Sequence, residues 1–155
     1  MAMELSLWRL ETSLNCNLHY LSLRQNQFSG GIPSSILNSR ELQVLDLRNN
    51  SLSMEFPIDI GELSDLSTLA LSRNQLTGGI PSLIQKLGRL ETLQFNNNRL
   101  SGVIPPWLFD IKGPNEFHLG GNSLTWKSGI TVEIVFEILV ELLAASRLGF
   151  YSNKS

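Results

Sequence analysis

The chain has little cysteine, little charge and no long apolar run. Its 155 residues include a single cysteine, Cys16, with 17% charged residues and a formal net charge of −2. One cysteine cannot close an internal disulfide or form a C-x-x-C metal site. The charge balance argues against nucleic acid or an anionic membrane as the main partner. Cys16 is interpreted as a small apolar filler near the first turn of the fold, or as half of a terminal cap whose partner cysteine this chain lacks.

Signals for membrane insertion and export are also missing. No stretch of about 18 uncharged apolar residues occurs, so no transmembrane helix is expected. The best candidate, residues 130–145, is interrupted by Glu133, Glu137 and Glu141. The N-terminal segment MAMELSLWRLETSL has no basic segment followed by an unbroken apolar run, so no secretory signal is expected.

An asparagine recurs every 24 residues in the same apolar frame. In the second turn, Leu42, Leu45 and Leu47 precede the asparagine and Leu52 follows it, and the other turns match this frame. A fixed period of this length indicates a solenoid, in which each turn is stabilised by its neighbours. The recurring asparagines are Asn26, Asn50, Asn74, Asn98 and Asn122.

The segment before each asparagine alternates apolar and variable residues, which is the period of a β-strand. In the second turn, Leu45 and Leu47 are predicted to point inward, and Asp46 and Arg48 outward. Stacked turns would align these strands in one parallel sheet. Each asparagine follows where the chain leaves the strand, and its amide can hydrogen-bond the backbone of the bend. We therefore expect the five asparagines to be structural.

The second half of each turn carries glycine and proline. The segments FSGGIPSSI, LTGGIPSLI and LSGVIPPWL follow three of the asparagines. Glycine permits the tight bend, and proline suits the first position of a short helical turn. The second turn departs from this pattern at residues 53–57, SMEFP, and a locally altered strand is expected there.

These motifs resemble the plant-specific leucine-rich repeat, L-x-x-L-x-L-x-x-N-x-L-[ST]-G-x-I-P. The segments VLDLRNNSLS and LSGVIPPWLFDIKG are similar to extracellular repeats of plant receptor-like proteins and receptor-like kinases, and the resemblance covers residues 18–124. It implies an α/β fold: a right-handed solenoid with a parallel concave sheet, a second small sheet, and short helical or 3₁₀ turns on the convex side. It also implies a location at the cell surface or outside the cell.

The chain is predicted to have three parts. Residues 1–17 form a partial turn or cap, residues 18–124 form five repeats of which the last is degenerate, and residues 125–155 form a non-repeat tail. Apolar residues in 130–148 have the spacing of an amphipathic helix. This helix either covers the open end of the solenoid or is not native to the repeat. Receptor ectodomains of this kind usually carry paired-cysteine caps, so the chain is expected to be a fragment of a longer protein, with a short free protein as the alternative.

No catalytic or metal-binding constellation is evident. His19 and His118 fall in different turns, and the paired glycines are bend residues without the lysine and hydroxyl pair of a phosphate loop. We therefore expect no enzymatic activity, no cofactor and no metal.

The outward residues of the concave strands are the predicted binding residues. Arg24 and Arg48 fall in one column beside Asp46. They would either clamp a ligand carboxylate or form a solvated charge cluster that Asp46 partly neutralises. Sequons at Asn49 and Asn153 are candidate glycosylation sites, and a glycan on Asn49 would restrict access to this face. The predicted ligand-binding residues are Tyr20, Ser22, Arg24, Asp46, Arg48, Ser72, Gln94, Asn96, Glu116 and His118.

The resemblance favours a module that binds a peptide or protein ligand in development or defence signalling, with a co-receptor as a further partner. An inhibitor module that binds a microbial cell-wall hydrolase and a structural scaffold are the alternatives.

Overall fold

The computed structural model describes residues 5–6, 18–109 and 116–125. Most of the expected N-terminal cap and the whole expected C-terminal helix, 130–148, therefore lie outside the described residues.

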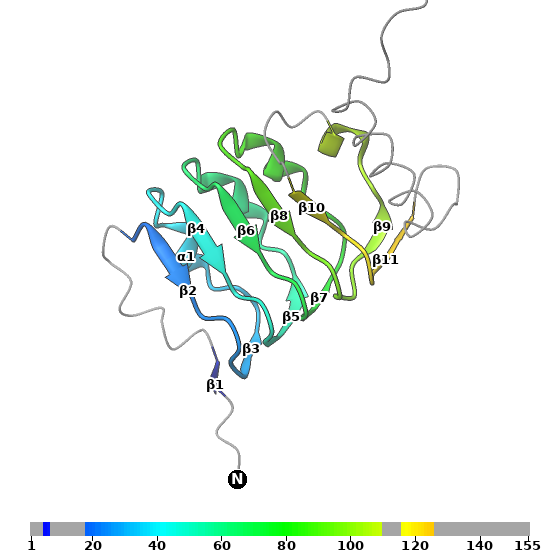
Figure 1. The fold of residues 1–155 in the computed structure, drawn as a ribbon, viewed down its shortest axis with the longest axis horizontal. Helices are drawn as coiled ribbons and strands as arrows, with labels where there is room; N and C mark the ends of the chain where they lie inside the picture. The colour runs from blue at the N-terminus through cyan, green and yellow to red at the C-terminus, as the bar shows by residue number, and fades with distance from the viewer. Residues whose placement is uncertain (1–4, 7–17, 110–115, 126–155) are drawn as a thin grey trace, which may run out of the picture.

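The described turns stack side by side as a solenoid (Figure 1). Five parallel strands line one face in the order β10-β8-β6-β4-β2. Register pairs residues one sequence period apart, such as Leu21 with Leu45 and Leu45 with Leu69. The strands are β2 (Tyr20–Ser22), β4 (Val44–Asp46), β6 (Thr68–Ala70), β8 (Thr92–Gln94) and β10 (Glu116–His118). The expected parallel concave sheet is confirmed.

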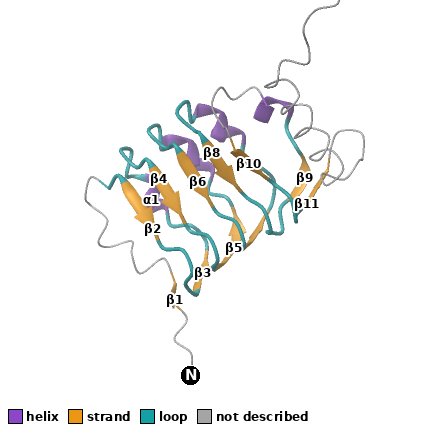
Figure 2. Cartoon of the chain, viewed as in Figure 1, coloured by secondary structure: helices purple, strands orange, loops and turns teal. Residues whose placement is uncertain are grey.

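Short helices lie behind the concave strands (Figure 2). They are α1 (Ser34–Leu37) and three 3₁₀ helices, η2 (Ile58–Glu62), η3 (Ser82–Lys86) and η4 (Pro106–Phe109). Pro33, Pro57 and Pro81 directly precede the first three, with φ angles of −65°, −62° and −69°. Because proline fixes φ in this range and lacks an N–H, it suits the start of a helical turn. The expected convex turns are confirmed.

A second set of parallel strands follows the asparagines. One sheet has the order β1-β3-β5-β7, and β9 pairs with β11. Backbone bonds from Arg99 N to Leu76 O and from Ser101 N to Gly78 O connect β7 to β9. The strands are β1 (Leu5–Ser6), β3 (Phe28–Gly30), β5 (Ser51–Glu55), β7 (Gln75–Thr77), β9 (Ser101–Val103) and β11 (Ser123–Thr125).

The second turn is altered where its sequence departs from the pattern. Strand β5 has five residues, whereas β3, β7 and β9 have three. Met54 occupies the position of Gly78 and adopts nearly the same backbone, with a φ of 84° against 80°. This left-handed conformation is unfavourable for a residue with a side chain, and Met54 adopts it while paired in register with Leu76 of β7.

Inward-pointing leucines form one continuous core through the stack. Leu45, Leu69 and Leu93 are fully buried in register on neighbouring strands. Phe56 and Phe95 add an aromatic contact with ring centroids 4.8 Å apart. Because neighbouring turns share this core, the concave strands have fixed positions relative to one another.

The recurring asparagines join each bend to the turn before it. The Nδ2 group of Asn74 donates to Leu71 O in its own turn and to Leu47 O in the preceding turn, both at 3.0 Å. Its Oδ1 accepts from Leu52 N at 3.0 Å. Asn50, Asn98 and Asn122 repeat these three bonds. Asn26 bonds only to carbonyls of its own turn within the described chain.

The residue before each asparagine has a left-handed backbone. Its φ lies between 56° and 58° at Gln25, Asn49, Arg73 and Asn97, and is 68° at Gly121. Sequence analysis missed this feature. The signal was the presence of asparagine or glycine at three of the five positions, because these residues tolerate positive φ best.

Ser39 is a weak point in the convex core. It occupies the position of Leu63 and Leu87, which are fully buried, and its own Oγ is buried without a hydrogen-bond partner among the described residues. Replacing Ser39 with leucine is expected to raise the free energy of unfolding by about 1–2 kcal/mol, through added apolar burial and removal of an unpaired hydroxyl.

Urea denaturation measures this change, with Ser39→Ala as the variant that removes only the hydroxyl and should gain less. A Ser39→Leu variant less stable than wild type would show that the first turn has no room for the larger side chain.

Candidate functional site

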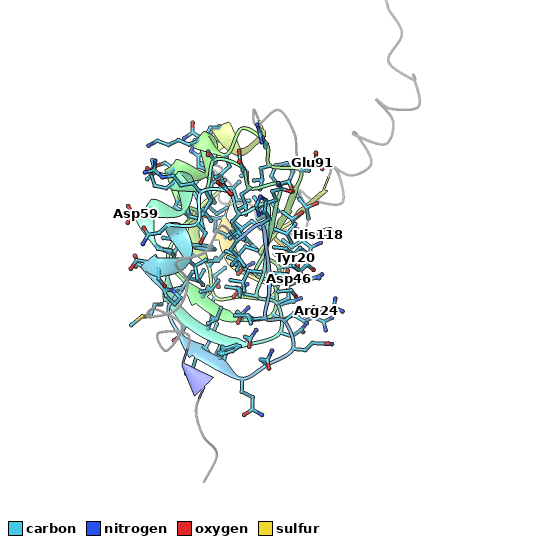
Figure 3. All side chains as sticks on the ribbon, turned by 90° about the vertical axis from the view of Figure 1, so that its left-hand side faces the viewer. Tyr20, Arg24, Asp46, Asp59, Glu91 and His118 are labelled. Carbon is cyan, nitrogen blue, oxygen red and sulfur yellow. The ribbon has the colours of Figure 1, made fainter. Side chains whose placement is uncertain are left out.

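A shallow depression lies on the concave face where four turns meet. Its volume is about 340 Å³ and its lining is polar without a carboxylate. Figure 3 shows Tyr20, Asp46 and His118 on the same side of the ribbon, with Asp59 on the opposite side. The lining residues are Arg48, Asn49, Ser72, Arg73, Gln94, Asn96 and His118.

An ion pair between a buried carboxylate and a half-buried guanidinium forms the base of this face. Asp46 is only 4% exposed. Arg48 donates from Nε to Asp46 Oδ1 at 2.8 Å and from Nη2 to Oδ2 at 2.7 Å, and its backbone N–H reaches Oδ1 at 3.2 Å. A bidentate pair of this kind fixes both side chains in direction as well as in distance.

The charge state of Asp46 follows from this contact. Burial would raise the pKa of Asp46, but the hydrogen bonds and positive charge of Arg48, with a smaller contribution from the charge of Arg24, hold it below its ordinary value. The same hydrogen bond to Asp46 raises the pKa of Arg48. Both groups are therefore charged at neutral pH.

Arg48 also reaches across the neighbouring strand. Its Nη1 donates to Gln94 Oε1 at 3.1 Å, two strands away. Ala70 stands in register between Asp46 and Gln94, and its small side chain leaves space for the guanidinium. Three of the five N–H donors of Arg48 are thus engaged, and two remain.

A second side-chain bond crosses the depression. Ser72 Oγ donates to Asn96 Oδ1, which leaves the amide nitrogen of Asn96 as a donor. The depression therefore presents guanidinium and amide N–H groups held by neighbouring turns. Such a surface can bind carboxylates, backbone carbonyls and hydroxyls.

The structure brings together half of the ten predicted binding residues. Arg48, Ser72, Gln94, Asn96 and His118 line the depression. Tyr20 and Ser22 lie on β2, at the edge of the described concave sheet, and Arg24 follows that strand. For Glu116 the structure describes only the backbone, in β10.

One expectation about this face needs correction. Asp46 was expected to point outward into solvent, but Arg48 covers it and buries it. The pairing of Arg48 with Asp46 agrees with the alternative of a charge cluster partly neutralised by Asp46, and the guanidinium of Arg48 also bonds to Gln94. The physical reason is that alternate side chains along an extended chain point to the same side. The guanidinium of Arg48 can therefore reach the carboxylate of Asp46, two residues earlier.

Two lining residues were not among the predicted binding residues. Arg73 was not singled out from the sequence, and Asn49 was singled out only as a glycosylation site. Both precede a ladder asparagine and have positive φ, so the backbone turn places them at the rim of the depression. The candidate glycosylation site at Asn49 is thus half-buried at this rim, and Asn153 lies outside the described residues.

Among the described residues, no three histidine, cysteine or acidic side chains come together in a group that could hold a metal ion. No helix in residues 5–6, 18–109 and 116–125 has the length and apolar character needed to span a bilayer.

Comparison with known families decides the classification. The family model described as Leucine Rich Repeat matches residues 17–39, 41–63, 65–87 and 89–111, which is more than half of the chain. The chain belongs to the leucine-rich-repeat family. The fifth turn of this leucine-rich-repeat protein lies largely beyond the matched segments but still contributes β10, β11 and Asn122.

Solved structures with the same repeat support this classification. The ectodomain of the plant membrane receptor kinase GASSHO1/SCHENGEN3 from Arabidopsis thaliana, in complex with CASPARIAN STRIP INTEGRITY FACTOR 2, is 38% identical with a TM-score of 0.67 over 70% of this chain and 13% of its own. The PEPR1–AtPEP1 complex is 38% identical with a TM-score of 0.71, over 74% of this chain and 16% of its own. A plant ice-binding protein is 34% identical with a TM-score of 0.66, over 70% of this chain and 35% of its own.

The leucine-rich-repeat protein thus spans about one sixth or less of the two receptors. A comparison with curated proteins found no match. Its repeats are similar to those of plant receptor-kinase ectodomains.

Proposed function

We propose that the chain is a non-catalytic binding module of a plant receptor-like protein, located at the cell surface or outside the cell. Its concave face would receive a peptide or protein ligand, and a co-receptor would complete the signalling complex. The observation that carries this proposal is the depression on the concave face, where arginine and amide donors are held in place by neighbouring turns.

The chemistry of the depression favours a peptide over an apolar small molecule. Arg73 is exposed at the rim, Arg48 has two remaining N–H donors, and Asn49 and Asn96 add amide groups. These donors match backbone carbonyls and carboxylates, which an extended peptide carries along its length. Because the ion pair and cross-strand bonds already fix the side chains, less conformational entropy is lost on binding.

Receptor ectodomains similar to this chain are solved in complex with partners, which supports the proposal. The similar ice-binding protein shows that related repeats also serve other functions. The second candidate function is inhibition of a microbial cell-wall hydrolase, for which the same polar concave face would provide the contact surface. A panel of such hydrolases assayed with and without the protein separates this candidate, because a peptide receptor leaves their rates unchanged.

Selection from a random peptide library tests the concave face. Peptides selected on the wild-type chain are expected to bind at least about tenfold more weakly to a Gln94→Ala/Asn96→Ala variant, a loss of about 1.4 kcal/mol or more. Both residues line the depression.

The control variant is Asn38→Ala/Gln85→Ala. It removes the same two kinds of amide from exposed positions at the end of α1 and within η3 on the convex side. It should bind the selected peptides as wild type does. Equal binding by both variants, measured on chains with native thermal unfolding, would reject the concave face as the binding surface.

A further inference from the structure

Charge is distributed unequally between the two long edges of the solenoid. We use the term bend edge for the segments 24–27, 48–51, 72–75, 96–99 and 120–123, which surround the ladder asparagines. These segments contain four arginines and no acidic residue. Their other residues are asparagine, glutamine, serine and glycine, so the edge combines positive charge with many amide groups.

Two arginines on the opposite edge, Arg40 and Arg89, are paired with carboxylates. Arg89 Nη1 lies 2.9 Å from Asp65 Oδ1, and Arg40 Nη2 lies 3.6 Å from Glu62 Oε2. In Figure 3, Glu91 marks this upper edge and Arg24 lies toward the lower, bend edge. The charges of these two arginines are therefore compensated locally by carboxylates.

The four arginines of the bend edge form a stripe with one member in each of four consecutive turns. Arg24 and Arg48 stand two residues before their asparagines, Arg73 stands one before, and Arg99 stands one after. Because neighbouring turns are about 4.8 Å apart, the stripe crosses the bend edge diagonally with steps of about 5–8 Å.

Three of the four arginines of this stripe form no ion pair with a carboxylate of the described chain. Arg24, Arg73 and Arg99 are exposed, and their side chains form no ion pair with any described residue. Arg48 is neutralised by Asp46. The bend edge therefore carries about three uncompensated positive charges in a chain whose formal net charge is −2.

We propose that the bend edge is a second binding surface, which takes an extended acidic segment of a partner protein. Alternate residues of an extended strand are about 6.6–6.8 Å apart, which is within the range of about 5–8 Å for the steps along the stripe. Because Arg48 is held by Asp46, acidic residues of the segment would meet the guanidinium groups of Arg24, Arg73 and Arg99, and arginine binds carboxylates in a fork that lysine lacks. The amide groups between the arginines would bond the backbone of the segment.

This surface overlaps the depression in part. The residues that belong to both are Arg48, Asn49, Ser72, Arg73 and Asn96. Arg24 and Arg99 belong to the bend edge alone, so their replacement tests this edge without altering the lining of the depression.

A fluorescein-labelled peptide of alternating glutamate and serine, ten residues long, serves as the probe. Fluorescence anisotropy at low salt measures its affinity for the whole chain, because exposed charge interactions are strongest there. We expect the Arg24→Gln/Arg99→Gln variant to bind at least about tenfold more weakly than wild type.

The Arg40→Gln/Arg89→Gln variant changes the net charge equally on the opposite edge and should stay within about twofold of wild type. The Gln94→Ala variant, which alters the depression at a residue outside the bend edge, should stay within about twofold of wild type. Failure of the wild-type chain to bind, or equal weakening by both arginine variants, would overturn the proposal. Equal affinity for a peptide with its five glutamates in one block would overturn the alternate spacing.

Discussion

Replacing Asn74 with alanine is expected to lower the free energy of unfolding by about 2–4 kcal/mol. The backbone N–H of Leu52 is buried and loses its acceptor, Asn74 Oδ1, and a buried unpaired donor costs about 1–3 kcal/mol. The carbonyls of Leu47 and Leu71 each lose one bond but keep a second, from Asn50 and Asn98 respectively. The small cavity left by the amide adds the remainder.

The first asparagine provides a matched control. Asn26 is exposed and bonds only to Leu23 O and Arg24 O within the described residues, so Asn26→Ala should cost less than about 1 kcal/mol. Urea denaturation of the two variants compares an amide that bridges turns with one that serves its own turn. Equal losses would mean that the bonds between turns contribute nothing to stability.

Replacing Arg48 with methionine is expected to cost about 2–3 kcal/mol at neutral pH. The substitution leaves the carboxylate of Asp46 buried without its partner, and breaking a buried pair from one side is strongly destabilising. Arg48 is partly exposed in the wild-type chain, so water can reach the carboxylate of Asp46 in the variant. This access keeps the cost of the substitution low for a buried carboxylate that loses its partner.

The cost of this substitution should depend on pH. In the wild-type chain the pKa of Asp46 is below its ordinary value of 3.8, so the pair stabilises the fold above that value and loses its effect as the pH falls through the lower, folded pKa. Without Arg48, burial dominates and raises the pKa of Asp46, so the variant recovers as the carboxyl takes up a proton.

Unfolding free energies of both chains at about pH 7 and about pH 3 test this dependence, and the difference should shrink at the lower pH. Arg89→Met is the control, because the Arg89–Asp65 pair is largely exposed and should contribute less than about 1 kcal/mol. A difference that is independent of pH would show that Arg48 stabilises the fold by packing alone.

Much of the fold was predictable because its information is periodic. The leucine frame and the recurring asparagine place every described concave strand, and a proline directly precedes each of the four described convex turns. Met54 shows the limit of this reasoning. The missing glycine predicts an altered strand, and β5 is longer than β3, β7 and β9, but the sequence does not reveal that Met54 keeps the backbone conformation of glycine.

The candidate site was predictable only in part. Strand alternation places Arg48, Gln94 and Asn96 on the concave face. It does not reveal that Arg48 turns back onto Asp46 and crosses Ala70, because side-chain direction depends on neighbours in other turns. The same limit explains why Arg73 was missed at the rim.

The central claim is that inter-turn asparagines lock the bends and thereby fix the columns of concave side chains. Hydrogen exchange of the asparagine side-chain NH₂ groups, followed by NMR, tests this claim directly. The account predicts strong protection for Asn74 and Asn98, which are buried and bonded to two turns, and fast exchange for the exposed Asn26. Equally fast exchange of all three would contradict it.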